Sequence, residues 1–153
     1  MIRTLRPWSG NGGKRLVRAP KVYLRDSGIT HAVLNLTSLE DLFGHPVAGP
    51  SCEGFVLENR LSCLPPGFSP WFYRTAAGAE IDLVIEKNNR ERIAIEIKPA
   101  MAPSVSKGFY IGCEDLKAGK RFIVYPGKER FPISKDVTVI PILEMMNVLE
   151  AEK

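Results

Sequence analysis

Cysteine is scarce in this chain, and its few copies follow no metal-binding pattern. The three residues Cys52, Cys63 and Cys113 are an odd number, and no two stand in a Cys-x-x-Cys spacing. A disulfide framework uses an even number of cysteines, and zinc sites use closely spaced pairs. We therefore expect reduced thiols buried in the core, as is typical of a reducing compartment. Cys52 and Cys63 lie eleven residues apart, close to three helical turns, so both are expected to face the core.

Long apolar runs are absent. No stretch approaches the roughly 18 consecutive apolar residues that a membrane-spanning helix needs, and the first residues lack the apolar core of a secretory signal. The sequence therefore predicts no membrane partner and a cytoplasmic protein.

A nucleotide-binding P-loop is missing as well. The glycine-rich segment Gly10-Asn11-Gly12-Gly13-Lys14 lacks the Walker A spacing and the Ser or Thr that must follow the lysine. The chain is therefore not expected to hydrolyse ATP by that route.

The composition that is present belongs to an ordinary globular domain. Of the 153 residues, 44% are hydrophobic and 25% are charged, and the formal net charge is +4. This length suits one domain. The positive charge is compatible with DNA or RNA as a partner but does not require one.

Residues 1–20 are expected to form an arm, or the remnant of a junction with a preceding domain, ahead of a single domain at 21–153. The segment 8–13 has the composition of a loop, and a basic run follows it: Lys14, Arg15, Arg18 and Lys21. A solvated arm is the favoured interpretation, and a nucleic-acid contact is the alternative. We expect the residues before Lys14 to bury little core.

Hydrophobic patterns, caps and breakers predict an α/β (α+β) fold with a mixed central sheet flanked by helices. Helices are predicted at 29–36, 38–44, 50–64, 104–116 and 141–149. Strands are predicted at 22–24, 71–75, 80–86, 92–98, 120–125 and 137–140. From residue 50 the order is helix, strand, strand, strand, helix, strand. We expect 120–125 to join the sheet that contains Glu96, and the preceding helix to cover one face of it.

Two carboxylates interrupt apolar strands on either side of a polar hairpin loop at 87–91. Asp82 precedes Leu83-Val84-Ile85, and Glu96 follows Ile93-Ala94-Ile95. Charges are depleted in strands unless something uses them. Strict alternation places Glu80, Asp82 and Val84 on one face of the strand and Ile81, Leu83 and Ile85 on the other.

The hairpin register predicts which charges meet. If the numbers of opposed residues sum to 178, Lys87 faces Glu91 and Glu80 faces Lys98, both favourable pairs. The same register sets Asp82 against Glu96, and two opposed carboxylates repel unless a cation or a proton lies between them. Mg²⁺ or Mn²⁺, which prefer oxygen ligands, would relieve this repulsion.

The helix predicted at 50–64 carries a further acid. Glu53 falls in its expected first turn, where the helix dipole favours a carboxylate, so a structural role and a metal-binding role are both open. Glu58 lies five residues further on, about 140° around the helix, so the two acids are not expected to hold one ion together.

Asp82 followed by Glu96-Ile97-Lys98 on adjacent strands resembles the PD-(D/E)XK nuclease superfamily, whose core also has an acid on a preceding helix. The chain as a whole resembles the domain of unknown function found C-terminal to an AAA+ ATPase and a winged helix in many bacterial and archaeal ATPases. The segments that carry this likeness are 13–16, 20–28, 53–56, 73–75, 78–82, 96–98 and 121–127. The resemblance implies a restriction-endonuclease-like core. It also implies either a fragment of a longer ATPase or a free-standing copy of its C-terminal domain.

The resemblance also implies roles for individual residues in a magnesium- or manganese-dependent nuclease. The implied metal ligands are Glu53, Asp82, Glu96 and the carbonyl of Ile97. The implied catalytic residues are Asp82, Glu96 and Lys98, with Lys98 orienting water or stabilising charge on the phosphate. Arg74 and Lys107 are the expected contacts to backbone phosphates.

Two alternatives to a nuclease stay open from the sequence. The domain is either an inactive docking or regulatory module of the ATPase, with residual acids, or a nucleic-acid-binding module that does not cleave. In both cases Lys98 would serve only as the cross-strand partner of Glu80.

Overall fold

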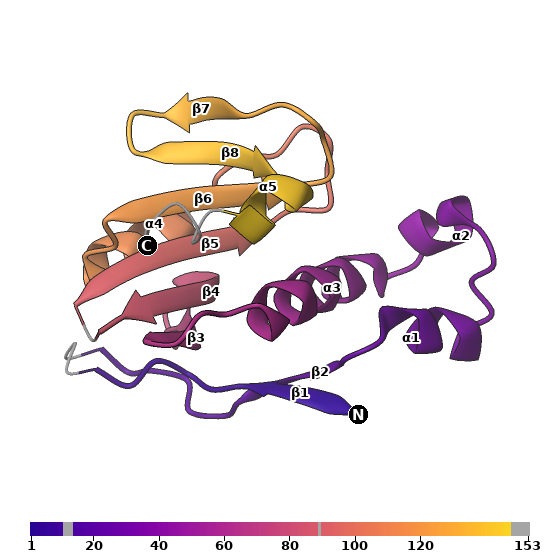
Figure 1. Ribbon diagram of the computed structural model, residues 1–153, viewed down its shortest axis with the longest axis horizontal. Helices are drawn as coiled ribbons and strands as arrows, with labels where there is room; N and C mark the ends of the chain where they lie inside the picture. The colour runs from indigo at the N-terminus through magenta and orange to yellow at the C-terminus, as the bar shows by residue number, and fades with distance from the viewer. Residues whose placement is uncertain (11–13, 89, 148–153) are drawn as a thin grey trace.

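Residues 1–10, 14–88 and 90–147, which the computed structural model describes, form a six-stranded mixed sheet, helices on both its faces and a two-stranded hairpin (Figure 1). The sheet strands, in spatial order, are β3 (Phe68–Arg74), β4 (Glu80–Lys87), β5 (Glu91–Ile97), β6 (Lys120–Tyr125), β8 (Val137–Pro141) and β7 (Phe131–Ser134). The hairpin pairs β1 (Ile2–Leu5) with β2 (Lys21–Leu24). The helices are α1 (Ser27–Val33), α2 (Leu39–Gly44), α3 (Ala48–Ser62), α4 (Lys107–Leu116) and α5 (Ile142–Asn147). The predicted mixed sheet flanked by helices is confirmed.

The strand order confirms that residues 120–125 join the sheet that contains Glu96. β3, β4 and β5 are antiparallel neighbours, and β6 runs parallel to β5. Parallel neighbours require a crossover connection, which α4 supplies. β8 continues the sheet parallel to β6, and the edge strand β7 was not predicted from the sequence. None of the helices in the described ranges is long and apolar enough to cross a membrane.

The predicted register of the β4–β5 hairpin is confirmed where the two strands pair. Lys87 lies opposite Glu91, and Leu83 lies opposite Ile95. The ladder ends at that second pair, so the expected pairs Glu80–Lys98 and Asp82–Glu96 lie beyond it.

A β-bulge interrupts the expected alternation of β4 at Asp82. Trp71 pairs with Val84 and Tyr73 pairs with Ile81, which leaves one residue of β3 opposite Asp82 and Leu83. Ile81 therefore packs in the same buried cluster as Val84, whereas Leu83 belongs to the other cluster. The prediction that Ile81 and Leu83 share a face is wrong, because the bulge inserts an extra residue between them.

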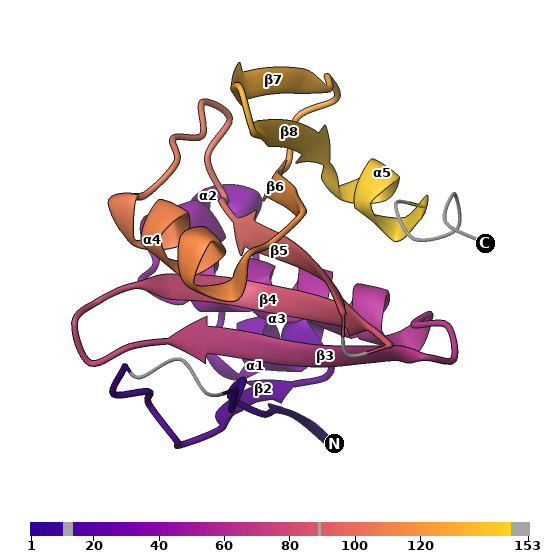
Figure 2. The ribbon, with the colours of Figure 1, turned by 90° about the vertical axis from the view of Figure 1, so that its left-hand side faces the viewer.

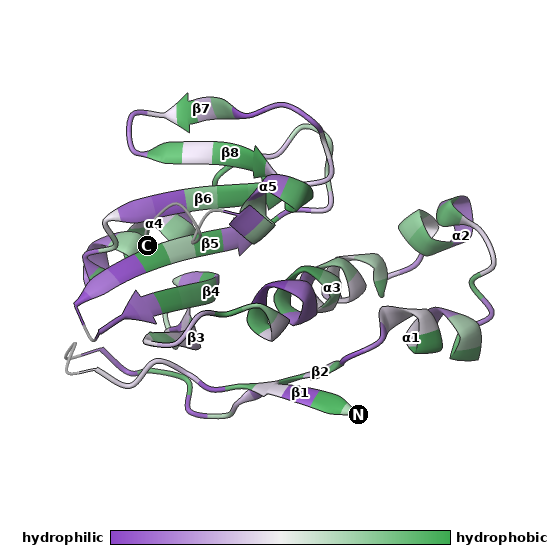
Figure 3. Ribbon diagram, in the orientation of Figure 1, coloured by the Kyte–Doolittle hydropathy of each residue, from purple (hydrophilic) through white to green (hydrophobic). Residues whose placement is uncertain are grey.

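Helices α3 and α4 cover opposite faces of the sheet (Figure 2). Each helix contributes apolar side chains to one of two buried clusters, Val56 and Leu57 from α3 and Phe109 and Leu116 from α4. The strands between them are apolar over much of their length, as the hydropathy colouring shows (Figure 3). Burial on both faces explains why the middle of these strands is an uninterrupted apolar run.

Residues 1–8 contribute more to the folded core than the sequence predicts. Leu5 is 1% exposed and lies in the cluster under α3. The chain continues beside β3, where the Trp8 amide donates to the Phe72 carbonyl at 2.7 Å and the Phe72 amide donates to the Arg6 carbonyl at 3.0 Å. The expectation that residues before Lys14 bury little core is therefore wrong. A four-residue strand with one buried leucine is too short for its alternation to be recognised.

The three cysteines are free thiols in different environments. Cys113 on α4 is buried, Cys52 is half-buried and Cys63 is exposed. The expectation of a buried thiol is wrong for Cys63, because α3 ends at Ser62 and the chain turns there.

Replacing Leu5 tests whether the N-terminal strand is part of the folded domain. We expect Leu5→Ala to lower the free energy of unfolding by about 2–4 kcal/mol, because a fully buried leucine leaves a cavity. The matched substitution Ile2→Ala, at a side chain that is 60% exposed on the same strand, should cost less than about 1 kcal/mol. Urea unfolding of both variants measures the difference. Equal, small costs would show that β1 is not part of the cooperative unit.

Candidate functional site

An open cavity of about 490 Å³ brings most of the predicted site residues together. It lies where the N-terminal ends of α3 and α4 meet the turn before β4 and the end of β5. Its lining residues are Gly49, Pro50, Glu53, Gly78, Glu80, Asp82, Glu96, Ile97, Lys98, Pro99, Ser106 and Gly108. We call this cavity the acidic cleft. All of the predicted catalytic residues and metal ligands are among these residues, and Glu80 adds another carboxylate.

Lys21 lies among the carboxylates of the acidic cleft, although the sequence pattern placed it in a solvated basic run. Its Nζ is 2.8 Å from Glu53, 3.0 Å from Glu80 and 3.5 Å from Asp82. Its side chain is 13% exposed. Burial alone would lower the pKa of Lys21, but the nearby charge of Glu53 and the hydrogen bond to it outweigh burial, so the pKa is raised. Lys21 is therefore a partly buried ammonium held by three acids.

Glu53 is fixed by contacts that the helix-dipole explanation did not anticipate. α3 begins at Ala48, so Glu53 lies in its second turn, beyond the reach of most of the N-terminal dipole. Its carboxylate accepts hydrogen bonds from the Lys21 ammonium and the Tyr23 hydroxyl. Burial and the bond to Glu53 raise the pKa of Tyr23, so its proton stays on the hydroxyl. The hairpin strand β2 therefore supplies two donors to this one acid.

The pKa of Asp82 is raised in the acidic cleft. Burial, followed by the charge of Glu53, raises its pKa to about 6, against the opposing effects of the Ile97 amide and Lys21. The Ile97 amide donates to Asp82 Oδ2 at 2.9 Å. The sequence assigned the repulsion at Asp82 to Glu96, but the carboxylate that most raises its pKa is Glu53 from α3.

Glu96 and Lys98 form a second charged group beside the N-terminus of α4. Lys98 Nζ is 2.8 Å from Glu96 Oε1, and the Ser106 amide donates weakly to Glu96 Oε2 at 3.4 Å. Ser106 caps α4, and a Cβ added to Gly108 would lie 2.7 Å from the Gly78 carbonyl oxygen. Glycine at 108 thus allows the positive end of α4 to sit close against the turn before β4.

Glu80 has partners other than the one expected from the register. It pairs with Lys21 and with Arg74, and although burial works in the opposite direction, these bonds lower the pKa of Glu80. Lys98 pairs with Glu96 instead, so the expected Glu80–Lys98 pair is wrong. The ladder has already ended at Leu83, and the two strands no longer align these side chains.

The remaining predicted residues lie at or beyond the rim. Arg74 is 40% exposed and is held by Glu80. Lys107 is exposed at the first position of α4 and is not among the residues that line the cleft. Glu58 binds Arg3 and Arg25, whose hydrogen bonds lower its pKa to about 2 despite its burial. It anchors the hairpin to α3 and lies outside the cleft.

The carboxylates suit Mg²⁺ or Mn²⁺ in chemistry but not in their present arrangement. Oxygen donors are what these ions prefer, and the acids outnumber the cations that pair with them. In the ranges 1–10, 14–88 and 90–147, however, no three His, Cys, Asp or Glu side chains are grouped so that they could hold a metal ion. The ammonium of Lys21 lies between Glu53, Glu80 and Asp82. Any divalent ion bound by these three acids would have to replace that ammonium.

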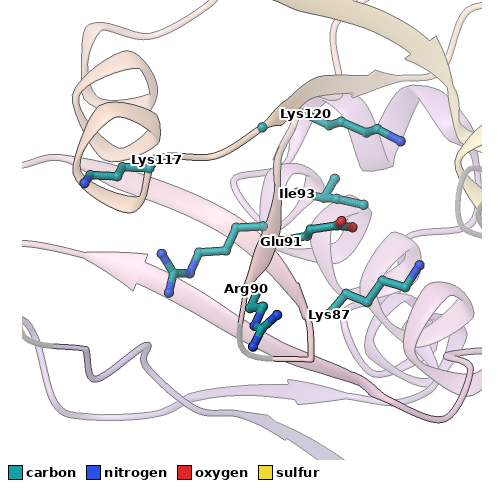
Figure 4. A pocket seen from close by; sticks show the side chains of 8 residues that line it. Lys87, Arg90, Glu91, Ile93, Lys117 and Lys120 are labelled. Carbon is teal, nitrogen blue, oxygen red and sulfur yellow. The ribbon is translucent and has the colours of Figure 1, made fainter.

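A second cavity of about 490 Å³ lies at the other end of β5 and has the opposite charge (Figure 4). Its lining residues are Lys87, Arg90, Glu91, Arg92, Ile93, Lys117, Gly119 and Lys120. Arg92 is fixed there by Glu86 at 2.6 Å and by the Leu116 carbonyl at 2.9 Å. With five basic side chains and one acid, we call it the basic cavity.

The chain was compared with known protein families. Residues 48–145 match the family described as Domain of unknown function (DUF4143). The chain belongs to this family. Residues 1–40 match a second family, described as Domain of unknown function (DUF8612). Within the DUF4143 segment lie Glu53, Asp82, Glu96 and Lys98, whereas Lys21 and Tyr23 come from the other segment. The residues that line the acidic cleft of this DUF4143 protein thus come from the 48–145 segment, and the other segment supplies two side chains that bind Glu53.

Curated relatives are considerably longer than this chain. An uncharacterized protein of Mycobacterium tuberculosis and one of Mycobacterium bovis are each 41% identical to it over 142 residues. These matches cover 92% of the chain and 32% of each relative. The chain therefore spans about a third of the length of the curated relatives it matches.

One solved structure is similar at a low level. It is described as a refined half-complex from a tetradecameric assembly of Thermococcus gammatolerans McrB AAA+ hexamers with bound McrC. The TM-score is 0.47 and the identity 15%, over 69% of this chain and 33% of that chain.

The raised pKa of Asp82 predicts an unusual pH dependence of stability. Between its ordinary 3.8 and about 6, folded Asp82 keeps a proton that the unfolded chain has lost, so wild-type stability falls as the pH rises through this range. Asp82→Asn removes that cost. We expect the variant to gain up to about 2–3 kcal/mol over wild type by neutral pH, and to gain nothing once the pH is below about 4.

Urea unfolding of wild type and Asp82→Asn across this pH range measures the difference. Glu53, Glu80 and Lys21 face Asp82 in both proteins, so the comparison isolates the aspartate. Asp136→Asn, at an exposed position between β7 and β8, is the matched control for removing one surface carboxylate. A difference that does not vary with pH, or a loss at every pH, would contradict the account of Asp82.

Proposed function

We propose that this DUF4143 domain is a divalent-cation-dependent phosphodiesterase acting on nucleic acid, built on the PD-(D/E)XK pattern. The observation that carries the proposal is the convergence of Asp82, Glu96 and Lys98 in one open cleft. These residues lie 14 and 2 positions apart in sequence, on neighbouring strands, and Glu53 joins them from a preceding helix. That combination is the one the superfamily pattern requires.

Positive groups lie close to the acids of the cleft. Lys98, the α4 N-terminus at Ser106 and the exposed Lys107 supply positive charge, which suits the oxygens of a phosphodiester. Asp82, Glu96 and Glu53 would hold Mg²⁺ or Mn²⁺, and such an ion polarises a phosphodiester and makes water more acidic. Lys98, oriented by Glu96 at 2.8 Å, stabilises the charge that develops on the phosphate.

We further propose that the domain works as part of a longer AAA+ ATPase, as its sequence resemblance implies. The support is that curated relatives are about three times as long as this chain. The chain has no Walker A segment of its own, so ATP hydrolysis would belong to another part of such a protein.

A nucleic-acid-binding module without cleavage is the second candidate. The basic cavity favours it, because five Lys or Arg side chains around one hollow suit a phosphate backbone. It lies at the opposite end of β5 from Glu96 and needs none of the acids. Binding that persists after the acids are removed would favour this candidate.

A cleavage assay separates the two candidates. Single- and double-stranded DNA and RNA are incubated with the protein in millimolar Mg²⁺ or Mn²⁺, and the products are resolved on gels. We expect metal-dependent cleavage that falls about 100-fold or more in Asp82→Asn, Glu96→Gln and Lys98→Met. Glu114→Gln, at an exposed α4 residue paired with Arg121, should retain it. No cleavage of any substrate by wild type, or cleavage that survives Asp82→Asn, would refute the nuclease.

A further inference from the structure

Lys21 occupies the position in the acidic cleft that best suits a cation. Its ammonium is within 3.5 Å of Glu53, Glu80 and Asp82, and it also lies over the Phe72 ring, 5.5 Å from the centroid. A surface lysine with one acidic partner would be an ordinary ion pair. Lys21, with three acidic partners and a side chain that is 13% exposed, is instead held in place by the charges of the site.

The charge balance of the cleft shows what removal of Lys21 would do. Its ion-paired side chains are Glu53, Glu80, Asp82, Glu96, Lys21, Arg74 and Lys98. Four acids against three bases leave one net negative charge. Without Lys21 the cleft carries two, which is the charge that one divalent cation neutralises.

We propose that Lys21 is an internal counter-cation that competes with the divalent metal ion for Glu53 and Asp82. The metal enters only when the lysine side chain swings out, so Lys21 sets the metal concentration at which the cleft is loaded. This inference rests on the proposed metal-dependent function and names a control of that same site.

The competition has a simple thermodynamic form. The apparent metal affinity is the intrinsic affinity multiplied by the fraction of molecules in which Lys21 has left the cleft. A lysine stem is long and flexible enough to leave without moving the backbone of β2. Replacing the ammonium with an uncharged group of similar length should therefore raise metal affinity without creating any new ligand.

Calorimetric titration with Mn²⁺ alone tests the proposal without any measurement of activity. We expect Lys21→Met to bind Mn²⁺ at least about 10-fold more tightly than wild type, and its melting temperature to rise more with Mn²⁺. The matched control is Lys14→Met, because Lys14 belongs to the same basic run but pairs with Asp115, outside the cleft, at 2.6 Å. It should bind Mn²⁺ like wild type.

A double variant covers the case in which Lys21→Met fails to fold with its acids uncompensated. Lys21→Met with Glu80→Gln removes one charge of each sign, and it should still bind Mn²⁺ more tightly than Glu80→Gln alone. Binding by wild type and Lys21→Met with equal affinity, or weaker binding by the variant, would overturn the role of Lys21 alone. Absence of binding in both at millimolar Mn²⁺ would overturn the metal site, and with it both proposals.

Discussion

The ion pairs of Lys21 with Glu53, Glu80 and Asp82 are the interaction on which the acidic cleft depends. Three carboxylates in a partly buried space repel one another, and a cation among them offsets that repulsion. Lys21 comes from the hairpin, Glu53 from α3 and the other two acids from β4. The same contacts therefore join three elements of the fold and set the charge of the site.

The middle of the fold could be predicted because its signals are local. The β4–β5 register follows from charges at the loop, such as Lys87 and Glu91, and from apolar alternation near it. The crossover through α4 follows from the order of elements. The candidate residues Asp82, Glu96 and Lys98 could be predicted because they are close together in the sequence and lie on strands that the sequence also predicts.

The features that could not be predicted from the sequence depend on contacts between segments that are distant in the chain. Lys21 is 32 residues from Glu53 and 61 from Asp82, and in the sequence it looks like one more member of a basic run. No glycine or proline occurs at the bulge beside Asp82. The sequence therefore predicts a regular strand there. The sequence predicts Glu53 in a first helical turn because Pro50 favours a helix start, whereas α3 begins at Ala48.

Diffraction from crystals soaked in Mn²⁺ tests the central claim most directly, since manganese scatters anomalously and can be located without bias. The account predicts an anomalous peak in the acidic cleft at coordination distance, about 2.2 Å, from Asp82 and Glu96, with the Lys21 ammonium displaced from Glu53. A cleft without manganese, or manganese bound there with Lys21 still on its three carboxylates, would contradict it.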